Sequence, residues 1–161
     1  MLRIFIDADA CPVKPEAYRV AARYRLPVTL VANSCMRIPA DGLVTLQVVG
    51  GGFDAADDWI AGHVRPCDIV ITADVPLASR CIAAGACVIG TSGKPFTEGN
   101  IGQAVATRNL LAELRGAGEM TGGPPPLTDR DRSRFLQQLD ATIQTIRRKN
   151  PAAIPGGTGT V

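Results

Sequence analysis

The chain has 161 residues, a formal net charge of +2 and a hydrophobic fraction of 46%. This length fits one domain, and this hydrophobic fraction excludes global disorder. No run of about 18 apolar residues is present, and Asp7 comes too early for a signal peptide, so we expect a cytoplasmic protein that does not bind membranes. The five cysteines are scattered and accompanied by one histidine, which argues against a structural zinc site.

Short apolar runs alternate with helical patterns along most of the chain. Strands are predicted at residues 2–6, 28–32, 43–49, 68–72 and 86–89. Helices are predicted at residues 15–24, 54–63, 76–84 and 100–115. The inward face of the last of these helices is predicted to carry Ile101, Val105, Leu110, Leu111 and Leu114. Continuously apolar strands separated by helices predict a three-layer α/β fold with a five-stranded, mostly parallel, doubly wound sheet.

A Gly/Pro-rich loop at residues 116–127 precedes a long C-terminal helix predicted at 128–149. Thr128 and Asp131 resemble a capping box at its start. Its apolar stripe consists of Phe135, Leu139, Ile143 and Ile146. Residues 150–161 are predicted to be a disordered tail, so residues 1–149 form the single domain. The positive excess of the chain lies in residues 127–161, which fits a nucleic-acid footprint or a solvated helix face.

Aspartates follow two of the predicted strands. Asp7 and Asp9 follow the first strand, and Asp74 follows the fourth. The ligand crevice of an open parallel sheet lies beyond the carboxyl ends of its strands, so we expect these carboxylates to converge there, with Asp54, Asp57 and Asp58 adding more negative charge. Clustered carboxylates stay ionised only beside a cation, and oxygen ligands suit Mg²⁺ or Mn²⁺. The simpler alternative is that Asp54 and Asp74 act only as helix N-caps.

Further polar side chains are candidates for contacts with a substrate in the same crevice. Asn33, Ser34 and Arg37 follow the second strand, and Lys94 follows the fifth and suits a phosphate. Lys14 and Arg80 are the cations closest in sequence to the aspartates. A solvated surface is the competing interpretation for this group. Cys11 is not expected to be a nucleophile, because nearby carboxylates raise the pKa of its thiol.

Four motifs resemble the YaiI/YqxD family of bacterial proteins over residues 1–149. They are D-A-D-A-C-P from Asp7, G-F-D-x-A-D from Gly52, I-T-A-D-x-P-L-A from Ile71, and T-G-G-P from Thr121 followed by D-R-x-R-x-x-F from Asp129. The resemblance implies a PIN-like fold, related to metal-dependent nucleases that cut RNA or flap DNA. It also implies functional roles for Asp7, for Asp74 in a T-x-D motif, and for Asp54 or Asp57 as the middle acid. The acid that often follows T-x-D in PIN proteins is absent, and Asp9 is the candidate to replace it.

Three functions remain open from the sequence. The first is a Mg²⁺- or Mn²⁺-dependent phosphodiesterase acting on structured DNA or, preferably, RNA. In it Asp7, Asp57 and Asp74 hold metal, Asp9 holds metal or orients water, and Arg130 and Arg132 bind phosphates. The second is a haloacid dehalogenase-type phosphatase with Asp7 as nucleophile and Asp9 as acid/base. The third is a non-catalytic module that binds nucleic acid or protein.

Overall fold

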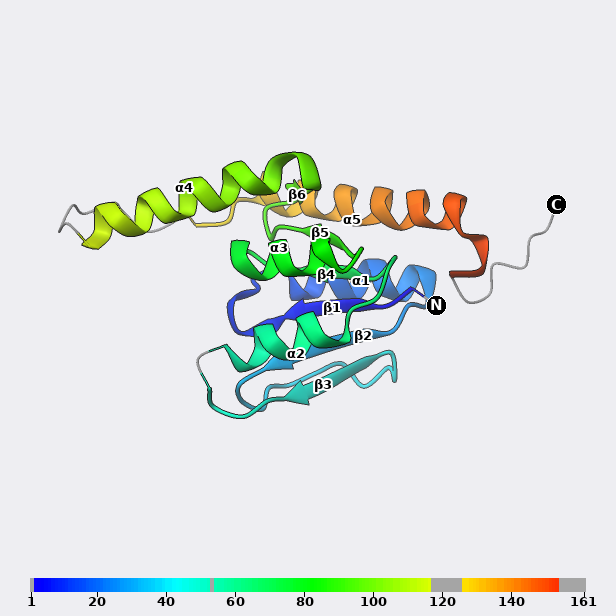
Figure 1. Ribbon diagram of the computed structural model, residues 1–161. Coiled ribbons are helices and arrows are strands. Elements are labelled where there is room, and N and C mark those ends of the chain that lie inside the picture. The colour runs from blue at the N-terminus through cyan, green and yellow to red at the C-terminus, as the bar shows by residue number, and fades with distance from the viewer. Residues whose placement is uncertain (1, 53, 117–125, 154–161) are drawn as a thin grey trace.

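A computed structural model describes residues 2–52, 54–116 and 126–153. In these ranges six strands form one sheet in the order β3-β2-β1-β4-β5-β6 (Figure 1). The strands are β1 (Ile4–Asp7), β2 (Val28–Ala32), β3 (Val44–Val48), β4 (Ile69–Ile71), β5 (Cys87–Ile89) and β6 (Pro95–Phe96). The helices are α1 (Lys14–Tyr24), α2 (Ala55–His63), α3 (Val75–Ala83), α4 (Glu98–Gly116) and α5 (Asp129–Lys149), with short 3₁₀ turns η1 (Ala8–Ala10) and η2 (Pro151–Ala153).

The mixed α/β class with a mostly parallel sheet is confirmed, whereas the five-strand count was wrong. Strands β1 to β5 pair in parallel, and β6 adds an antiparallel edge to β5. β6 has only two residues and begins with Pro95, so it carries no periodic pattern. Proline is tolerated at such an edge because no further strand needs its missing N–H group.

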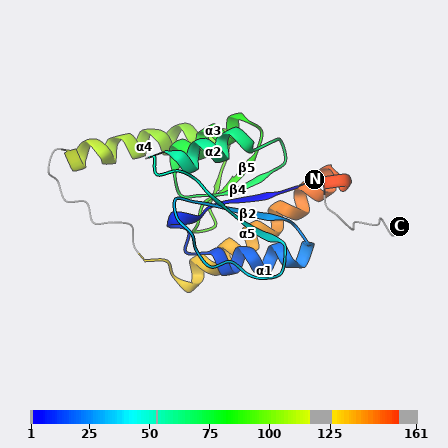
Figure 2. The ribbon, with the colours of Figure 1, turned by 90° about the horizontal axis from the view of Figure 1, so that it is seen from below.

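Helices cover both faces of the sheet, as Figure 2 shows most clearly. α1 and α5 lie on one face, and α2, α3 and α4 lie on the other. Successive side chains of a strand point to opposite faces. Accordingly, Ile4 and Ile6 belong to the core beneath α1 and α5, whereas Phe5 belongs to the core beneath α2 and α3.

The C-terminal helix follows its sequence prediction closely. Thr128 and Asp131 form the reciprocal capping box, and the four apolar residues of the predicted stripe are all buried. The helix ends at Lys149 as expected, but η2 follows it, so the chain is still regular at residues 151–153. Most of the predicted Gly/Pro loop and the tail from residue 154 lie outside the described residues.

The predicted inward stripe of α4 was wrong in its second half. Leu110 is 56% exposed and Leu111 is 40% exposed, and no residue of α4 counts as buried. The cause is the placement of the helix: its second half extends past the carboxyl ends of the strands, where no sheet surface lies beneath it (Figures 1 and 2). Within the described residues, no helix is both long and apolar enough to cross a membrane.

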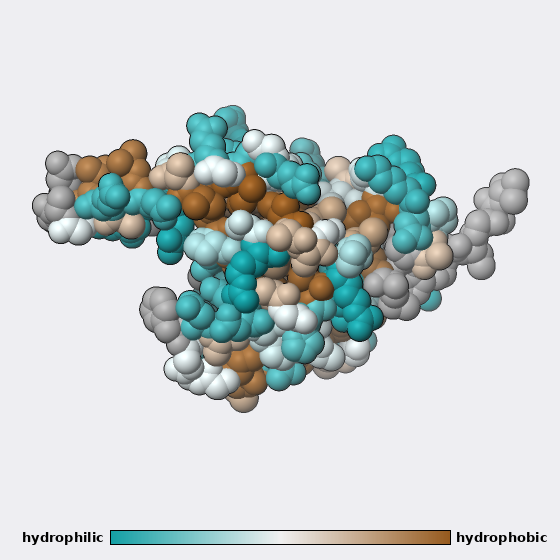
Figure 3. All heavy atoms as spheres, in the orientation of Figure 1, coloured by the Kyte–Doolittle hydropathy of each residue, from teal (hydrophilic) through white to brown (hydrophobic). Residues whose placement is uncertain are grey.

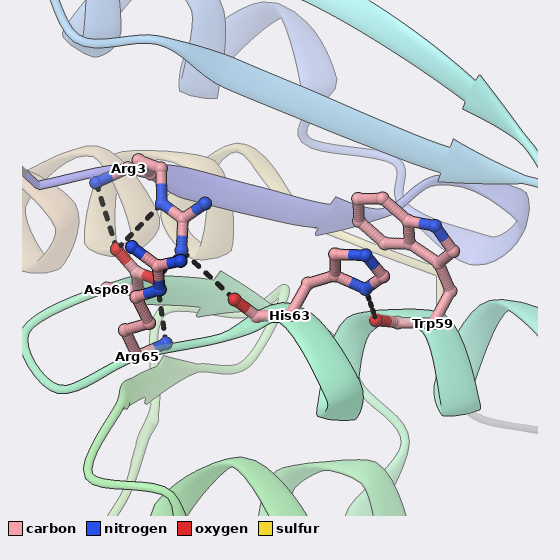
Figure 4. A network of polar contacts seen from close by, with 5 residues as sticks. All are labelled: Arg3, Trp59, His63, Arg65 and Asp68. Atoms are coloured by element: carbon pink, nitrogen blue, oxygen red, sulfur yellow. Dashed lines mark hydrogen bonds and ion pairs between the residues drawn. The ribbon is translucent and has the colours of Figure 1, made fainter.

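A buried carboxylate fixes the opposite, amino-terminal end of β4. Asp68 is 2% exposed and accepts hydrogen bonds from the guanidinium and backbone N–H of Arg3 and from the backbone N–H of Arg65 (Figure 4). Arg3 also donates to the carbonyl oxygen of His63, whose ring stacks on Trp59 with ring centroids 3.8 Å apart. These contacts join the starts of β1 and β4 to the end of α2, far from the carboxyl ends of the strands.

Candidate functional site

Five aspartates line one pocket of about 300 Å³ beyond the carboxyl ends of the strands. They come from the end of β1, from η1, from the first turn of α2 and its preceding residue, and from the start of α3. The pocket is lined by Asp7, Asp9, Asn33, Asp54, Ala56, Asp57, Asp74, Pro76 and Arg108. The predicted convergence of carboxylates that are distant in sequence is therefore present in the structure.

The sheet topology explains this convergence. β1 pairs with β2 on one side and with β4 on the other, so the chain direction around the sheet reverses between β1 and β4. Ligands of open α/β sheets bind at such a switch point. Thr72 bridges it: its hydroxyl donates to Asp7 Oδ2 over 3.1 Å and accepts the backbone N–H of Asp74 over 3.0 Å.

The helix-capping interpretation holds for one of the two aspartates to which it was applied. Asp74 caps α3, because its Oδ1 accepts the backbone N–H of Leu77 over 3.0 Å. Asp54 occupies the N-cap position of α2, but its side chain makes no capping hydrogen bond. Capping does not exclude cation binding by Asp74, since a carboxylate offers several lone pairs on two oxygens.

Asp9 is exposed and is bonded to the residue that follows β2. Its Oδ2 accepts the backbone N–H of Asn33 over 3.1 Å. This bond joins the 3₁₀ turn after β1 to the residue that follows β2. Asp9 therefore presents its carboxylate to the pocket from a defined position, although it belongs to a short turn.

Negative charge is crowded in this pocket. Burial and the charges of Asp74 and Asp7 raise the pKa of Asp57 from 3.8 to about 7. Burial also raises the pKa of Asp7, and the charges of Asp74 and Asp9 add to the effect, while the hydrogen bond from Thr72 opposes it. A cation in the pocket would remove this repulsion.

The donor set fits a hard divalent cation with retained water. The titratable side chains that face the pocket are carboxylates and one arginine, with neither histidine nor cysteine among them. In the described part of the chain, no group of three or more His, Cys, Asp or Glu side chains is arranged so that it could hold a metal ion. Mg²⁺ prefers oxygen ligands, keeps several waters and binds through one or two carboxylates together with a phosphate.

The structure places the other predicted substrate-binding residues in different surroundings. Arg80 pairs with Asp58, Arg132 pairs with Glu16 and donates to the carbonyl of Pro12, and Lys14 donates to the carbonyl of Cys11. These four bonds are all made to the protein's own groups. Exposed side chains outside the pocket lining are Ser34, Arg37 and Arg130. Cys11 is buried, and this burial, more than the nearby acids, raises its pKa to about 11.

Arg108 is a charged residue of the pocket that was not predicted from the sequence. It lies on α4 and lines both the acidic pocket and a second, larger pocket that also contains Lys94. The available signal was the spacing of Arg108 and Arg115, which places both on one helix face. That signal has no meaning until the fold shows that this part of α4 lies beside the site.

Comparison with known proteins places the chain in a family. A family model described as "Uncharacterized BCR, YaiI/YqxD family" matches residues 5–145. A UPF0178 protein of Rhodopseudomonas palustris strain HaA2 is 58% identical over 93% of this chain and 92% of its own length. UPF0178 proteins of Bradyrhizobium sp. strain ORS 278 and Nitrobacter winogradskyi are each 56% identical, over 95% and 91% of this chain and 93% and 94% of their own lengths. No solved structure matches. On the extent and identity of these matches, the chain belongs to the YaiI/YqxD family.

Proposed function

We propose that this protein is a Mg²⁺- or Mn²⁺-dependent phosphodiesterase that cleaves RNA or structured DNA, with a PIN-like arrangement of acids. The observation that carries the proposal is the gathering of five aspartates at the switch point between β1 and β4. A surplus of carboxylates at such a position repels a phosphate unless a cation lies between them. The pocket is therefore suited to a phosphodiester only in the presence of metal.

The roles of the residues follow from their positions. Asp7 and Asp74 line the same pocket and would hold the ion, and Asp57, whose pKa is raised by both, would join them once the ion is bound. Asp54 is the alternative middle ligand, because its carboxylate is not used for capping. Asp9, held by Asn33, would bind the ion or orient the attacking water. When bound, the ion would stabilise the charge that develops on phosphorus and activate water.

The phosphatase alternative has less support from the geometry. Lys94, which such an enzyme would use near its nucleophile, lines the neighbouring pocket and not the aspartate pocket. Ser34 is exposed and is not part of the pocket lining. A non-catalytic binding module would have the same pocket but would cleave no nucleic acid, so a cleavage assay distinguishes it from the proposed enzyme.

The test is cleavage of end-labelled RNA and DNA, single-stranded and hairpin, with Mg²⁺ or Mn²⁺. We expect Asp7→Asn and Asp74→Asn to lower the cleavage rate by at least about 100-fold. Groups that only support a metal ligand cost at most about that much, and loss of a ligand itself should cost no less. Asp58→Asn is the matched control, because Asp58 neighbours Asp57 but points to Arg80 outside the pocket. Full activity of Asp7→Asn, or no cleavage by the parent protein with either metal, would overturn the proposal.

A further inference from the structure

A second, larger hollow adjoins the aspartate pocket and has the opposite charge. It has a volume of about 630 Å³ and lies between α4, the start of α3 and the β5–β6 turn. Among the described residues, its lining contains three cations, Lys94, Arg108 and Arg115, and no carboxylate. Figure 3 shows the second half of α4 as an arm projecting at the left, with the surface hollowed beneath it. We refer to this hollow as the α4 groove.

The α4 groove and the aspartate pocket meet at two places. Arg108 lines both of them. Ala73 lines the groove and the next residue, Asp74, lines the pocket, so the short segment after β4 separates the two. The groove and the pocket are therefore neighbours that share Arg108 and lie on either side of the segment after β4.

The side chains of the groove are presented by unrelated elements. Lys94 is held by a tight turn in which the backbone N–H of Gly90 donates to the Lys94 carbonyl over 2.8 Å. Arg108 and Arg115 lie two helical turns apart on α4. Phe96 on β6 adds an aromatic, half-buried surface to the same hollow.

We infer that the α4 groove binds a single-stranded segment of nucleic acid and leads it to the aspartate pocket, an assignment that rests on the proposed function. The three cations that line the described part of the groove attract a backbone that carries one phosphate per nucleotide. Phe96 offers a face on which one base can stack, which an unpaired base can reach and a paired base cannot. A duplex would present its phosphates outward but would keep its bases away from Phe96.

The experiment measures binding without cleavage. The full chain carrying Asp7→Asn is titrated into a fluorescein-labelled oligouridylate of roughly 12 nucleotides, within the usual range of site sizes for single strands. A duplex of the same length and an oligoglutamate of equal charge are titrated in parallel. The test variant is Arg108→Ala/Arg115→Ala, and the control is Arg147→Ala/Arg148→Ala, which removes equal charge from exposed residues at the far end of α5.

We expect the Arg108/Arg115 variant to lose at least about tenfold in affinity for the single strand, and the control to lose less than about twofold. The slope of log affinity against log salt should become shallower by about 1.4, because each phosphate contact on a single strand contributes about 0.7. The variant Arg108→Lys/Arg115→Lys keeps both positive charges and should retain most of the affinity of the parent. Circular dichroism shows whether each variant is folded.

Several results would overturn the inference. They are an equal loss of affinity in test and control variants, preference for the duplex, or equally tight binding of the oligoglutamate. The inference and the proposed function can fail separately. Binding that depends on Arg108 and Arg115, in a protein that cleaves nothing, retains the groove and rejects the nuclease. Cleavage whose KM is unchanged in the Arg108/Arg115 variant retains the nuclease and rejects the groove.

Discussion

The hydroxyl of Thr72 donates a hydrogen bond of 3.1 Å to Asp7 and joins the ends of two strands that are 65 residues apart in the chain. Thr72 is 1% exposed, so the donor of this bond is buried, and its acceptor Asp7 lines the aspartate pocket. The same hydroxyl accepts the backbone N–H of Asp74. The Thr72 hydroxyl therefore ties the Asp7 carboxylate to the backbone of Asp74 across the switch point.

Replacing that oxygen should weaken the site without removing a ligand. We expect Thr72→Val to lower Mn²⁺ affinity or cleavage by about 10–100-fold, the usual effect of losing a group that orients a metal ligand. Thr72→Ser keeps the hydroxyl and should stay within a few-fold of the parent. Isothermal titration with Mn²⁺ measures both variants. Equal affinities for Thr72→Val and Thr72→Ser would show that the hydrogen bond does not position Asp7.

The stability of the metal-free protein should fall as pH rises from about 4 to about 7. Asp57 has a pKa of about 7 in the folded state against an ordinary value of 3.8, so in this interval the folded state retains a proton that the unfolded chain has released. Stability falls with pH wherever the folded state binds more protons. Urea unfolding across this range should show the fall, with a shallower slope in Asp57→Asn and an unchanged slope in Asp58→Asn. Identical slopes in the parent and Asp57→Asn would contradict this assignment.

Magnesium should reverse that trend. Protons compete with the ion for the same carboxylates, so the rise in melting temperature on adding Mg²⁺ should be larger at pH 8 than at pH 5. Removal of the ion with a chelator should abolish the rise at both values. If the rise in melting temperature were as large at pH 5 as at pH 8, and as large in Asp7→Asn as in the parent, the bound ion would lie somewhere other than the aspartate pocket.

Much of this site follows from the sequence because it depends on strand ends. Asp7 and Asp74 end apolar runs that are recognisable as strands, and parallel strands bring such ends to one edge. The position of α4 does not follow in this way. Its leucines resemble an inward stripe, yet Leu110 and Leu111 are exposed, because only the tertiary fold shows that the helix extends past the sheet. Arg108 was missed for the same reason.

Long-range pairs of polar groups were also invisible to sequence patterns. Asp68 is the first residue of the predicted fourth strand, and its sequence context gives no sign that it is buried and bonded to Arg3, just before β1. β6 was missed because two residues carry no periodicity. In contrast, α5 was predicted almost completely, since its cap and its apolar stripe are local features of the sequence.

Breaking the Arg3–Asp68 pair should be costly. Asp68 accepts bonds from both Arg3 and Arg65, and removing one partner of a buried pair costs about 3–5 kcal/mol. Because Arg3 is partly exposed, we expect Asp68→Ala to fall near the lower end of that range. The exposed pair of Arg80 and Asp58 should be worth less than about 1 kcal/mol. Urea unfolding of Asp68→Ala and Asp58→Ala compares them, and similar losses would refute the prediction.

Gly93 should tolerate no side chain. Its φ is +88°, and a Cβ there would lie 2.6 Å from the backbone of Arg134 and Phe135 at the start of α5. We expect Gly93→Ala to lower the free energy of unfolding by about 1–3 kcal/mol. Gly102→Ala on α4 meets no atom within 4 Å and should raise it by about 0.5–1 kcal/mol. Thermal unfolding of both variants checks this pair, and a neutral Gly93→Ala would contradict the close approach.

The central claim is that one divalent cation occupies the aspartate pocket, and anomalous diffraction from a crystal soaked in Mn²⁺ tests it most directly. The account predicts an anomalous peak between the carboxylates of Asp7 and Asp74, and the loss of that peak in an Asp7→Asn crystal soaked in the same way. Manganese bound only at other positions, or no peak in a pocket open to solvent in the crystal, would contradict it.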